Sequence, residues 1–461
     1  MRGPDLRAAL DGVDWGVAVA GCLAGLESGS TATVLSGPSR RWSLDLAAVL
    51  GDMPISWRAV AGWPQLQPEG PDRWDRAALD RCDRRLDQLL DRGVRPGLTL
   101  LDVDMPQWVD AAGGWLNRDT AQRFADFAAG LGDRFGDRVA RWTTFSDVLV
   151  HSVADYIAGM LPTGRGVGLR GLAALHHVLL GSGLAIRALR QAGGGGEVGG
   201  SVGLTGAYAA SEDISDRIAL NRLECWAHRL LLDPMLLGRH MVAENDRSPV
   251  EESGCVRPGD MEAIAEPADV LGVVWHAPSR VAAPENLAKL LPVRECFSAF
   301  NDANRVLSRL GFVLVPMDAV ETNSYGWPVV PEALADAVAA LHDLYGDALP
   351  PLRIIDSGLS DPEPEPGPGF DEAERRSLLA AQLSWLARVM AGGVRISGYE
   401  YWSLVDYAGW KLRYVRHYAM AVDDRPHPPQ PEIPRDWPRE GAFGGPVAPV
   451  DRAGRPALHS V

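Results

Sequence analysis

Cysteine is scarce in this sequence, and its spacing gives no sign of a paired framework. Five cysteines are spread over 461 residues, and no two of them form a CxxC pair. An odd and widely scattered set without a CxxC pair argues against a disulfide framework and against a zinc site. We therefore expect reduced, structural thiols, no metal or other cofactor, and a cytoplasmic location.

Clusters of basic residues and long apolar segments are also missing. The chain has 45 Lys and Arg against 60 Asp and Glu, a formal charge of -15, and no basic block. This balance argues against nucleic acid or an anionic membrane as a partner. No run approaches the roughly 18 apolar residues of a membrane span. Val19–Cys22 has the form of a lipoprotein cleavage site, but Asp11 and Asp14 interrupt the apolar stretch of such a signal, so we interpret it as part of a strand.

Phenylalanine and tyrosine are few, whereas tryptophan is abundant. There are 15 Trp but only 9 Phe and 9 Tyr, and 46% of all residues are hydrophobic. Excess tryptophan suits a surface that stacks on sugars, and it equally suits packing in a large core. Both interpretations stay open from composition alone.

The stretch from residue 96 to 147 organises the chain. The apolar run Leu98–Leu101 ends directly before Asp102, and a second run, Val139–Phe145, ends directly before Ser146 and Asp147. A helical pattern separates the two runs. Strands joined by a helix and releasing polar side chains at their carboxyl ends are typical of a parallel α/β protein with its chemistry on one rim.

The same unit recurs along the chain and predicts an α/β fold, a single (β/α)8 TIM barrel over residues 1–424. The predicted strands are Asp14–Ala20, Ile55–Val60, Leu98–Leu101, Val139–Phe145, Ser201–Ala207, Asp269–His276, Leu352–Asp356 and Ile396–Leu404. The predicted helices are Trp42–Leu50, Asp72–Arg92, Thr120–Phe135 (capped by Asp119 or Thr120), Gly168–Ala192, Ile214–Leu237, Val330–Tyr345 and Glu372–Ala391. An open dinucleotide-binding sheet would need a Gly-rich turn after its first strand, which is missing. Residues 425–461 are Pro-rich and polar, and we expect a poorly ordered tail.

Several motifs resemble the retaining β-glycosidases of glycoside hydrolase family 1. They are Gly-Gly-Trp-Leu-Asn-Arg-Asp-Thr at 113–120, Leu-Asp-Pro-Met-Leu-Leu-Gly-Arg at 232–239, Gly-Trp-Pro-Val-Val-Pro-Glu-Ala-Leu at 326–334 and Trp-Ser-Leu-Val-Asp at 402–406. They occur in the family's order and cover nearly the whole chain up to about Asp424. The resemblance implies a (β/α)8 barrel and hydrolysis of O-glycosidic bonds, with a small glycoside or an oligosaccharide as substrate.

The resemblance assigns the catalytic roles to positions where this chain departs from the family. The family's Thr-Leu-Asn-Glu-Pro reads Thr-Phe-Ser-Asp-Val here, which puts Ser146 at the Asn and Asp147 at the acid/base Glu. Its Thr-Glu-Asn-Gly reads Ile-Asp-Ser-Gly, which puts Asp356 at the nucleophilic Glu. The resemblance therefore implies that Asp147 and Asp356 are the catalytic pair.

The family's sugar-binding positions are partly kept and partly lost. Arg58, Trp402 and Trp410 match the family, whereas Asp102 stands at the His of His-Trp-Asp-Leu-Pro and His276 at the Tyr that steadies the nucleophile. Three further positions differ: Leu23 replaces Gln, Val274 replaces Asn and Gly409 replaces Glu. The implied substrate-binding set is Asp102, Ser146, His276, Trp402 and Trp410, with Arg58 in a supporting role.

Replacing glutamate by aspartate changes the geometry of the catalytic pair. Retaining hydrolysis needs carboxyl groups about 5–5.5 Å apart. Each lost methylene draws a carboxyl back by up to about 1.5 Å. Two retractions open the gap to roughly 8 Å, in the range of inverting enzymes, where Asp147 and Asp356 would act as acid and base around a water.

Alternatives to each assignment stay open. Asp147 and Asp356 are equally polar strand ends in a disused pocket, and Asp102 with Asp104 is equally a capping or ion-pairing pair on the rim. For Trp402 and Trp410, core packing is as well supported as sugar stacking. A shared cavity of Asp102, Asp147, His276 and Asp356 could hold a divalent cation.

At the level of the whole chain, we predict a diverged β-glycosidase. The alternatives are a catalytically silent relative that binds a sugar or a partner, and a barrel whose acidic site serves other chemistry.

Arg58 is expected to contact Asp356 under any of these readings, because a buried carboxylate needs a partner.

Overall fold

The structure is a computed structural model that describes residues 3–23, 56–102, 104–159, 165–241, 248–290, 304, 307–317, 320–322, 327–357 and 372–401. The predicted helix at 42–50, the predicted tail at 425–461, and both Trp402 and Trp410 lie outside the described residues.

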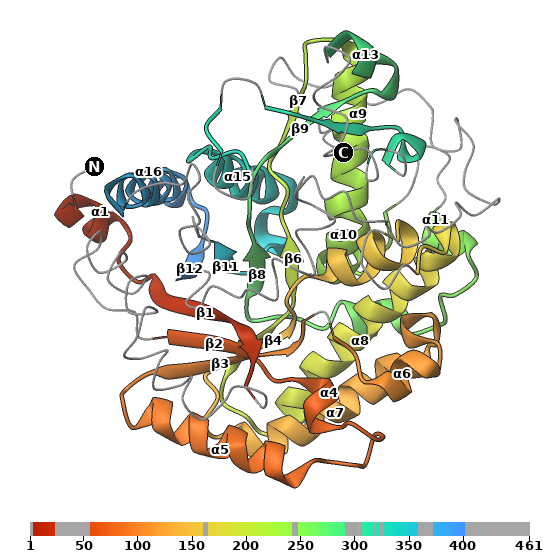
Figure 1. Ribbon diagram of the computed structural model, residues 1–461, viewed down its shortest axis with the longest axis vertical. Helices are drawn as coiled ribbons and strands as arrows, with labels where there is room; N and C mark the ends of the chain where they lie inside the picture. The colour runs from red at the N-terminus through yellow and green to blue at the C-terminus, as the bar shows by residue number, and fades with distance from the viewer. Residues whose placement is uncertain are drawn as a thin grey trace, which may run out of the picture.

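Parallel strands form the central sheet of the described chain (Figure 1). They are β1 (Asp14–Cys22), β2 (Ser56–Val60), β3 (Arg95–Leu101), β4 (Arg141–Phe145), β5 (Glu197–Gly199), β6 (Ser201–Gly203), β8 (Leu271–Val274), β11 (Leu352–Ser357) and β12 (Ile396–Tyr401). Their order in the sheet is β5-β4-β3-β2-β1-β12-β11-β8-β6. The first and last strands of that order are consecutive in the chain and separated by Gly200 alone, so they are two halves of one strand. Counted this way, eight strands close into the predicted (β/α)8 barrel.

The strands form where the sequence gives short apolar runs. In β3 every residue after Arg95 is buried, as expected for a strand with the barrel interior on one face and helices on the other. All eight predicted strands are present. The predicted Ser201–Ala207 strand is shorter and is preceded by β5.

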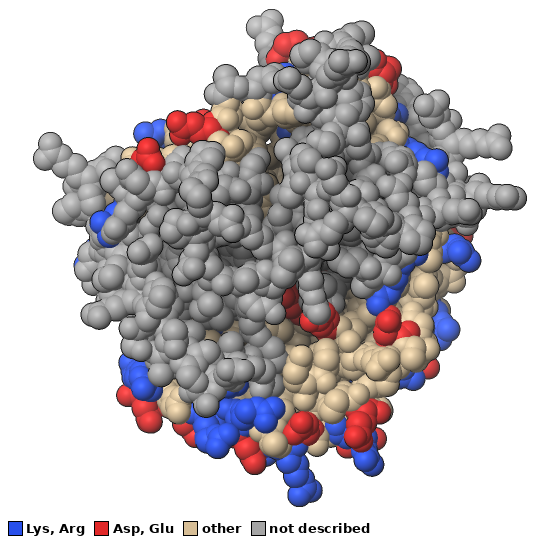
Figure 2. Space-filling model, viewed as in Figure 1, with Lys and Arg blue, Asp and Glu red and all other residues tan. Residues whose placement is uncertain are grey.

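Helices cover the outside of the barrel, with α5, α7 and α8 on the side of β1 to β4 and α15 and α16 near β11 and β12 (Figure 1). The described α-helices are α1 (Gly3–Ala9), α4 (Trp63–Leu66), α5 (Arg76–Leu90), α6 (Gln107–Ala111), α7 (Asp119–Phe135), α8 (Leu172–Gln191), α9 (Ile214–Glu224), α10 (Leu230–Leu237), α11 (Pro249–Glu252), α12 (Asp260–Ile264), α13 (Leu287–Leu290), α15 (Ala333–Tyr345) and α16 (Glu372–Ala391). A π-helix, Val150–Ile157, follows β4, and a second one joins α9 to α10. Charged side chains of both signs lie along the edge of the molecule where α5 lies, so the solvent-facing side of this helix is charged (Figure 2).

The start of α7 differs from the prediction. Neither Asp119 nor Thr120 caps it: the Asn117 Oδ1 atom accepts from the backbone N–H of Asp119 at 3.0 Å. The Thr120 hydroxyl instead donates to the carbonyl of Gly114 at 2.6 Å. Both contacts belong to the tight turn that holds Trp115 in the core, so this motif serves packing.

The expectation that no segment approaches the length and apolarity of a membrane span is wrong for helix α8 together with the short turn before it. Residues 168–191 are long and apolar enough to cross a membrane by length and composition. However, 78% of its apolar 18-residue window is buried inside the protein, where α8 packs against α7 and the barrel. Its composition is that of a core helix.

A small second sheet was not predicted. Its strands are β7 (Ala207–Ala209), β9 (Ser279–Ala282) and β10 (Val313–Val315), in the order β10-β9-β7. Two of them, β9 and β10, lie between the predicted strand Asp269–His276 and the predicted helix Val330–Tyr345, where no element was predicted. The sheet lies beyond the carboxyl ends of β6 and β8, beside α9 and α13 (Figure 1).

Candidate active site

The carboxyl end of the barrel brings together most of the predicted site residues. Asp102 follows the last residue of β3, Ser146 and Asp147 follow β4, and Asp356 is the last residue but one of β11. Because the strands are parallel, these residues share one end of the barrel. The sequence prediction that Asp147 and Asp356 lie at the same mouth agrees with this topology, and their roles stay a prediction.

Arg58, within β2, is the hub of this end. Its Nη2 atom donates to the Oδ1 atom of Asp356, which is the contact predicted from the sequence. Its Nε atom donates to the Oε2 atom of Glu400 at 2.6 Å, and its Nη1 atom donates to the Thr99 hydroxyl at 2.8 Å. Arg58 is only 4% exposed, so these three bonds satisfy a cation that water barely reaches. Its pKa lies above its ordinary value because burial is outweighed by the nearby carboxylates.

Asp356 has an unusual backbone. Its φ angle is +53°, the only positive φ among the described non-glycine residues, and the pairing of β11 with β12 shifts register between Ile354 and Ser357. A left-handed aspartate costs roughly 1–2 kcal/mol, and such strain is concentrated at functional sites. The irregularity aims the carboxylate at Arg58.

The ionisation of Asp356 suits a group that must be anionic near neutral pH. Burial raises the pKa of Asp356 to about 6; the Arg58 cation lowers it, while the Asp102 and Glu400 carboxylates raise it. At pH 7 about nine-tenths of the molecules therefore carry the charge. Its side chain keeps 14% exposure, which leaves the carboxylate reachable.

Asp102 pairs with the next strand and does not cap a helix. It accepts a hydrogen bond from the Ser146 hydroxyl, so two of the predicted substrate-binding residues contact each other. Burial raises the pKa of Asp102, opposed by the hydrogen bond from Ser146 and by the charge of Arg58. The Asp102 carboxyl therefore forms a hydroxyl–carboxyl pair with Ser146 at the mouth of the barrel.

Asp147 is held against the neighbouring strand. Its Oδ1 atom accepts from the backbone N–H of Gly203 at 2.8 Å and from that of Leu149 at 2.8 Å. A Cβ atom at position 203 would lie 2.3 Å from the Oδ2 atom of Asp147, so only glycine leaves room there. The two N–H bonds to Oδ1 fix the orientation of the Asp147 carboxyl.

His276 lies beside the position after Asp356. It lines a small cavity of about 20 Å³ together with Trp275, Pro278, Ser357 and Gln382. Its ring packs on Trp327 at 5.2 Å between centroids. His276 is exposed as a residue, whereas desolvation of its imidazole by the surrounding protein atoms lowers the pKa of the ring to about 4. His276 is therefore a neutral imidazole near pH 7.

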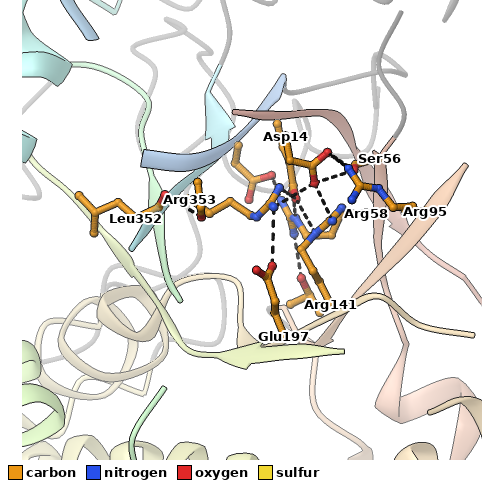
Figure 3. A network of polar contacts seen from close by, with 12 residues as sticks. Asp14, Ser56, Arg58, Arg95, Arg141, Glu197, Leu352 and Arg353 are labelled. Carbon is orange, nitrogen blue, oxygen red and sulfur yellow. Dashed lines mark hydrogen bonds and ion pairs between the residues drawn. The ribbon is translucent and has the colours of Figure 1, made fainter. Parts of the chain in front are cut away.

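Below the mouth, charged side chains fill the barrel interior (Figure 3). Asp14 accepts from Ser56 at 2.8 Å, from Arg141 at 2.7 Å and from Arg353 at 3.0 Å. The Cβ of an alanine at Gly398 would lie 2.3 Å from the Arg353 guanidinium, so the glycine makes room for it.

Sequence reasoning missed this buried network and its link to the mouth, Glu400. The available signal was a charged residue inside five of the predicted strands: Asp14, Arg58, Arg141, Arg353 and Glu400.

The cation alternative finds no support among the described residues. In the part of the chain that the structure describes, no three His, Cys, Asp or Glu side chains come close enough to hold a metal ion. Among the described cysteines, Cys82, Cys225 and Cys255 are not in disulfide bonds.

Comparison with known proteins agrees with the barrel and the motifs. The chain is 30% identical over 402 residues to thermostable beta-glucosidase B of Thermobispora bispora, covering 86% of this chain and 78% of that protein. It is 28% identical to the psychrophilic beta-glucosidase BglU of Micrococcus antarcticus, whose crystal structure superposes with a TM-score of 0.72 over 90% of this chain and 93% of that one. The virulence factor SghA, solved with its substrate analog salicin, is 24% identical with a TM-score of 0.69, over 87% and 89% of the two chains; at that identity the likeness shows the fold alone. Residues 28–437 match glycosyl hydrolase family 1, so this chain belongs to that family of O-glycosyl hydrolases.

Proposed function

We propose that this protein hydrolyses β-glycosides at the carboxyl end of its barrel, with Asp356 as the anionic group and Asp147 as the acid/base. The observation that carries the proposal is Asp356 itself: a strained, partly exposed carboxylate at a strand end, held by Arg58 and ionised near neutral pH. Asp356 attacks the anomeric carbon directly or activates a water that does so. The substrate is a small glycoside or an oligosaccharide, and the similarity to proteins named beta-glucosidases supports this class.

Asp147 supplies the proton for the leaving group. Two backbone N–H groups hold its Oδ1 atom, which fixes the carboxyl at the end of β4. General acid catalysis of this kind contributes about 10²- to 10⁴-fold. Asp102 and Ser146 lie on the adjoining strand ends, where their oxygens can bind sugar hydroxyls.

A second candidate is favoured by one observation. The two hydrogen bonds from backbone N–H groups hold the Asp147 carboxyl at the strand end beside Gly203, which is also what a purely structural carboxyl would do. In this alternative the barrel binds a glycoside without cleaving it. The two candidates predict different results in one experiment.

The test is hydrolysis of aryl β-glycosides by wild type, Asp356→Asn and Asp147→Asn. Asparagine tolerates positive φ, so it preserves the backbone at position 356. We expect Asp356→Asn to lose activity on every substrate. Asp147→Asn should lose about 10²- to 10⁴-fold in kcat/KM on a phenyl glycoside but under about tenfold on a dinitrophenyl glycoside, whose leaving group needs no proton.

Equal losses on both substrates would remove Asp147 from the acid role. Calorimetric binding of the glycosides by a wild type that does not cleave them would establish the second candidate.

A further inference from the structure

Glu400 is a carboxylate enclosed in the barrel. It lies on β12, between β1 and β11, and is 1% exposed. An ionised group is expensive to bury unless other charges surround it. The charges that face Glu400 come from three strands: Arg58 of β2, Arg141 of β4 and Arg353 of β11.

The two oxygens of Glu400 face different parts of the barrel. Oε2 accepts from the Nε atom of Arg58 at 2.6 Å. Oε1 lies 3.5 Å from Nη1 of Arg353 and 3.8 Å from Nε of Arg141. Both of these arginines also bind the Oδ2 atom of Asp14 (Figure 3). Arg141 and Arg353 therefore hold Glu400 from the barrel interior, and Glu400 in turn holds Arg58 at the carboxyl end of the barrel.

The Arg58 guanidinium has three nitrogen atoms: one contacts Asp356, and the other two contact Glu400 and Thr99. A guanidinium is planar, so the bonds from Nε to Glu400 and from Nη1 to Thr99 determine where Nη2 points. Nη2 points at Asp356. The direction of the cation at the mouth therefore depends on a carboxylate that does not touch the mouth.

We propose that Glu400 is a positioning residue for glycoside hydrolysis, acting through Arg58 on Asp356. The proposal rests on the function proposed above and extends it to the barrel interior. Glu400 aims Arg58 and offsets part of its positive charge. An arginine without a neighbouring carboxylate would stabilise the ionised form of Asp356 and weaken it as a base. Because Glu400 offsets part of the charge of Arg58, Asp356 stays a stronger base. The charged groups that face Asp356 are Arg58, Asp102 and Glu400.

The test compares Glu400→Gln with the matched control Glu197→Gln. Glutamine keeps an oxygen for the Nε bond and removes only the charge. Glu197 belongs to the same network, 3.8 Å from Arg353, and is half exposed. The primary readout is the pH titration of the Asp356 carboxyl by 13C NMR, assigned with Asp356→Asn. We expect Glu400→Gln to move its midpoint about one pH unit lower, and Glu197→Gln to leave it in place.

Kinetics of Glu400→Asp test the positioning directly. Aspartate keeps the charge that Arg141 and Arg353 need but draws the anchor of Arg58 back by up to about 1.5 Å. We expect kcat to fall about 100-fold with KM within about threefold. Glu400→Gln, which keeps the length, should retain at least tenfold more kcat than Glu400→Asp.

The outcomes separate this proposal from the proposed function. A titration midpoint that stays within 0.2 pH unit of wild type in Glu400→Gln, with the fold intact by circular dichroism, would overturn the role of Glu400 whether or not the protein is a hydrolase. If Glu400→Gln does not fold, kcat of Glu400→Asp decides, and a wild-type kcat refutes the proposal. A shifted midpoint in a protein without hydrolytic activity would keep the coupling and remove the proposed function.

Discussion

The ion pair between Arg58 and Asp356 sets the pH range in which the proposed reaction runs. The change to make is Arg58→Gln, which removes the cation and keeps a polar side chain. Two opposite charges about 4 Å apart interact by about 4 kcal/mol at an effective dielectric constant of about 20. That energy corresponds to about three pH units, at the upper end of the shifts that a close opposite charge produces.

The sign follows from the charge. Arg58 favours ionised Asp356, so its removal raises the pKa of Asp356 from about 6 to roughly 8 or 9. The ionised fraction at pH 7 then falls from about nine-tenths to between about one-tenth and one-hundredth. We expect kcat/KM at pH 7 to fall about 10- to 100-fold and to recover as the pH rises toward 9.

The assay is the pH profile of kcat/KM on an aryl β-glycoside. In wild type, activity should be lost below about pH 6, where Asp356 takes up a proton. Arg95→Gln is the control, because Arg95 pairs with Asp14 at the other end of the network and is half exposed. A loss in Arg58→Gln that is equal at every pH, with the acid limb unmoved, would refute the reasoning.

Three further results are expected. Gly203→Ala should displace the Asp147 carboxyl and lower kcat about 100-fold, whereas Gly195→Ala, with open space around it, should match wild type in the same steady-state assay; equal activity of the two would contradict the placement of Asp147. Asp14→Ala leaves two buried arginines without their shared carboxylate and should lower the free energy of unfolding in urea by about 3–5 kcal/mol; a loss under about 1 kcal/mol would show that the network is dispensable. NMR of the first-released sugar should show inverted configuration, since two aspartates widen the carboxyl gap to roughly 8 Å, and a retained anomer would instead make Asp356 a direct nucleophile.

The barrel was predictable because each strand is a short apolar run with breakers on both sides. Burial on both faces makes such runs continuous, so β3 and β8 stand out in the sequence. The small second sheet was not predictable on this basis. Its strands have three or four residues, too few to show a period, and they form only because β9 pairs with distant segments on both sides.

The site was predictable where it depends on strand ends and unpredictable where it depends on strand interiors. Asp102, Asp147 and Asp356 follow from the rule that chemistry gathers at carboxyl ends, and the Arg58 contact follows from the need of a buried carboxylate for a cation. Glu400 was missed because its partners lie far away in sequence: Arg58 is 342 residues distant. A charged residue in a buried strand signals a partner but does not name it.

The tether of Asp147 could not be read from the sequence either. It depends on the backbone N–H of Gly203, which reaches the carboxyl only because β6 lies beside the end of β4 in the closed barrel. The acid/base role of Asp147 was likewise predicted from the family resemblance alone. The structure adds that its shorter side chain reaches the neighbouring strand end.

A crystal structure of Asp356→Asn with an uncleaved aryl β-glycoside tests the account most directly. It should show the sugar at the carboxyl end of the barrel, with the anomeric carbon about 3–3.5 Å from the side chain at position 356 or one water away, and Asp147 beside the glycosidic oxygen. A glycoside bound elsewhere, or a sugar whose anomeric carbon faces away from position 356, would contradict it.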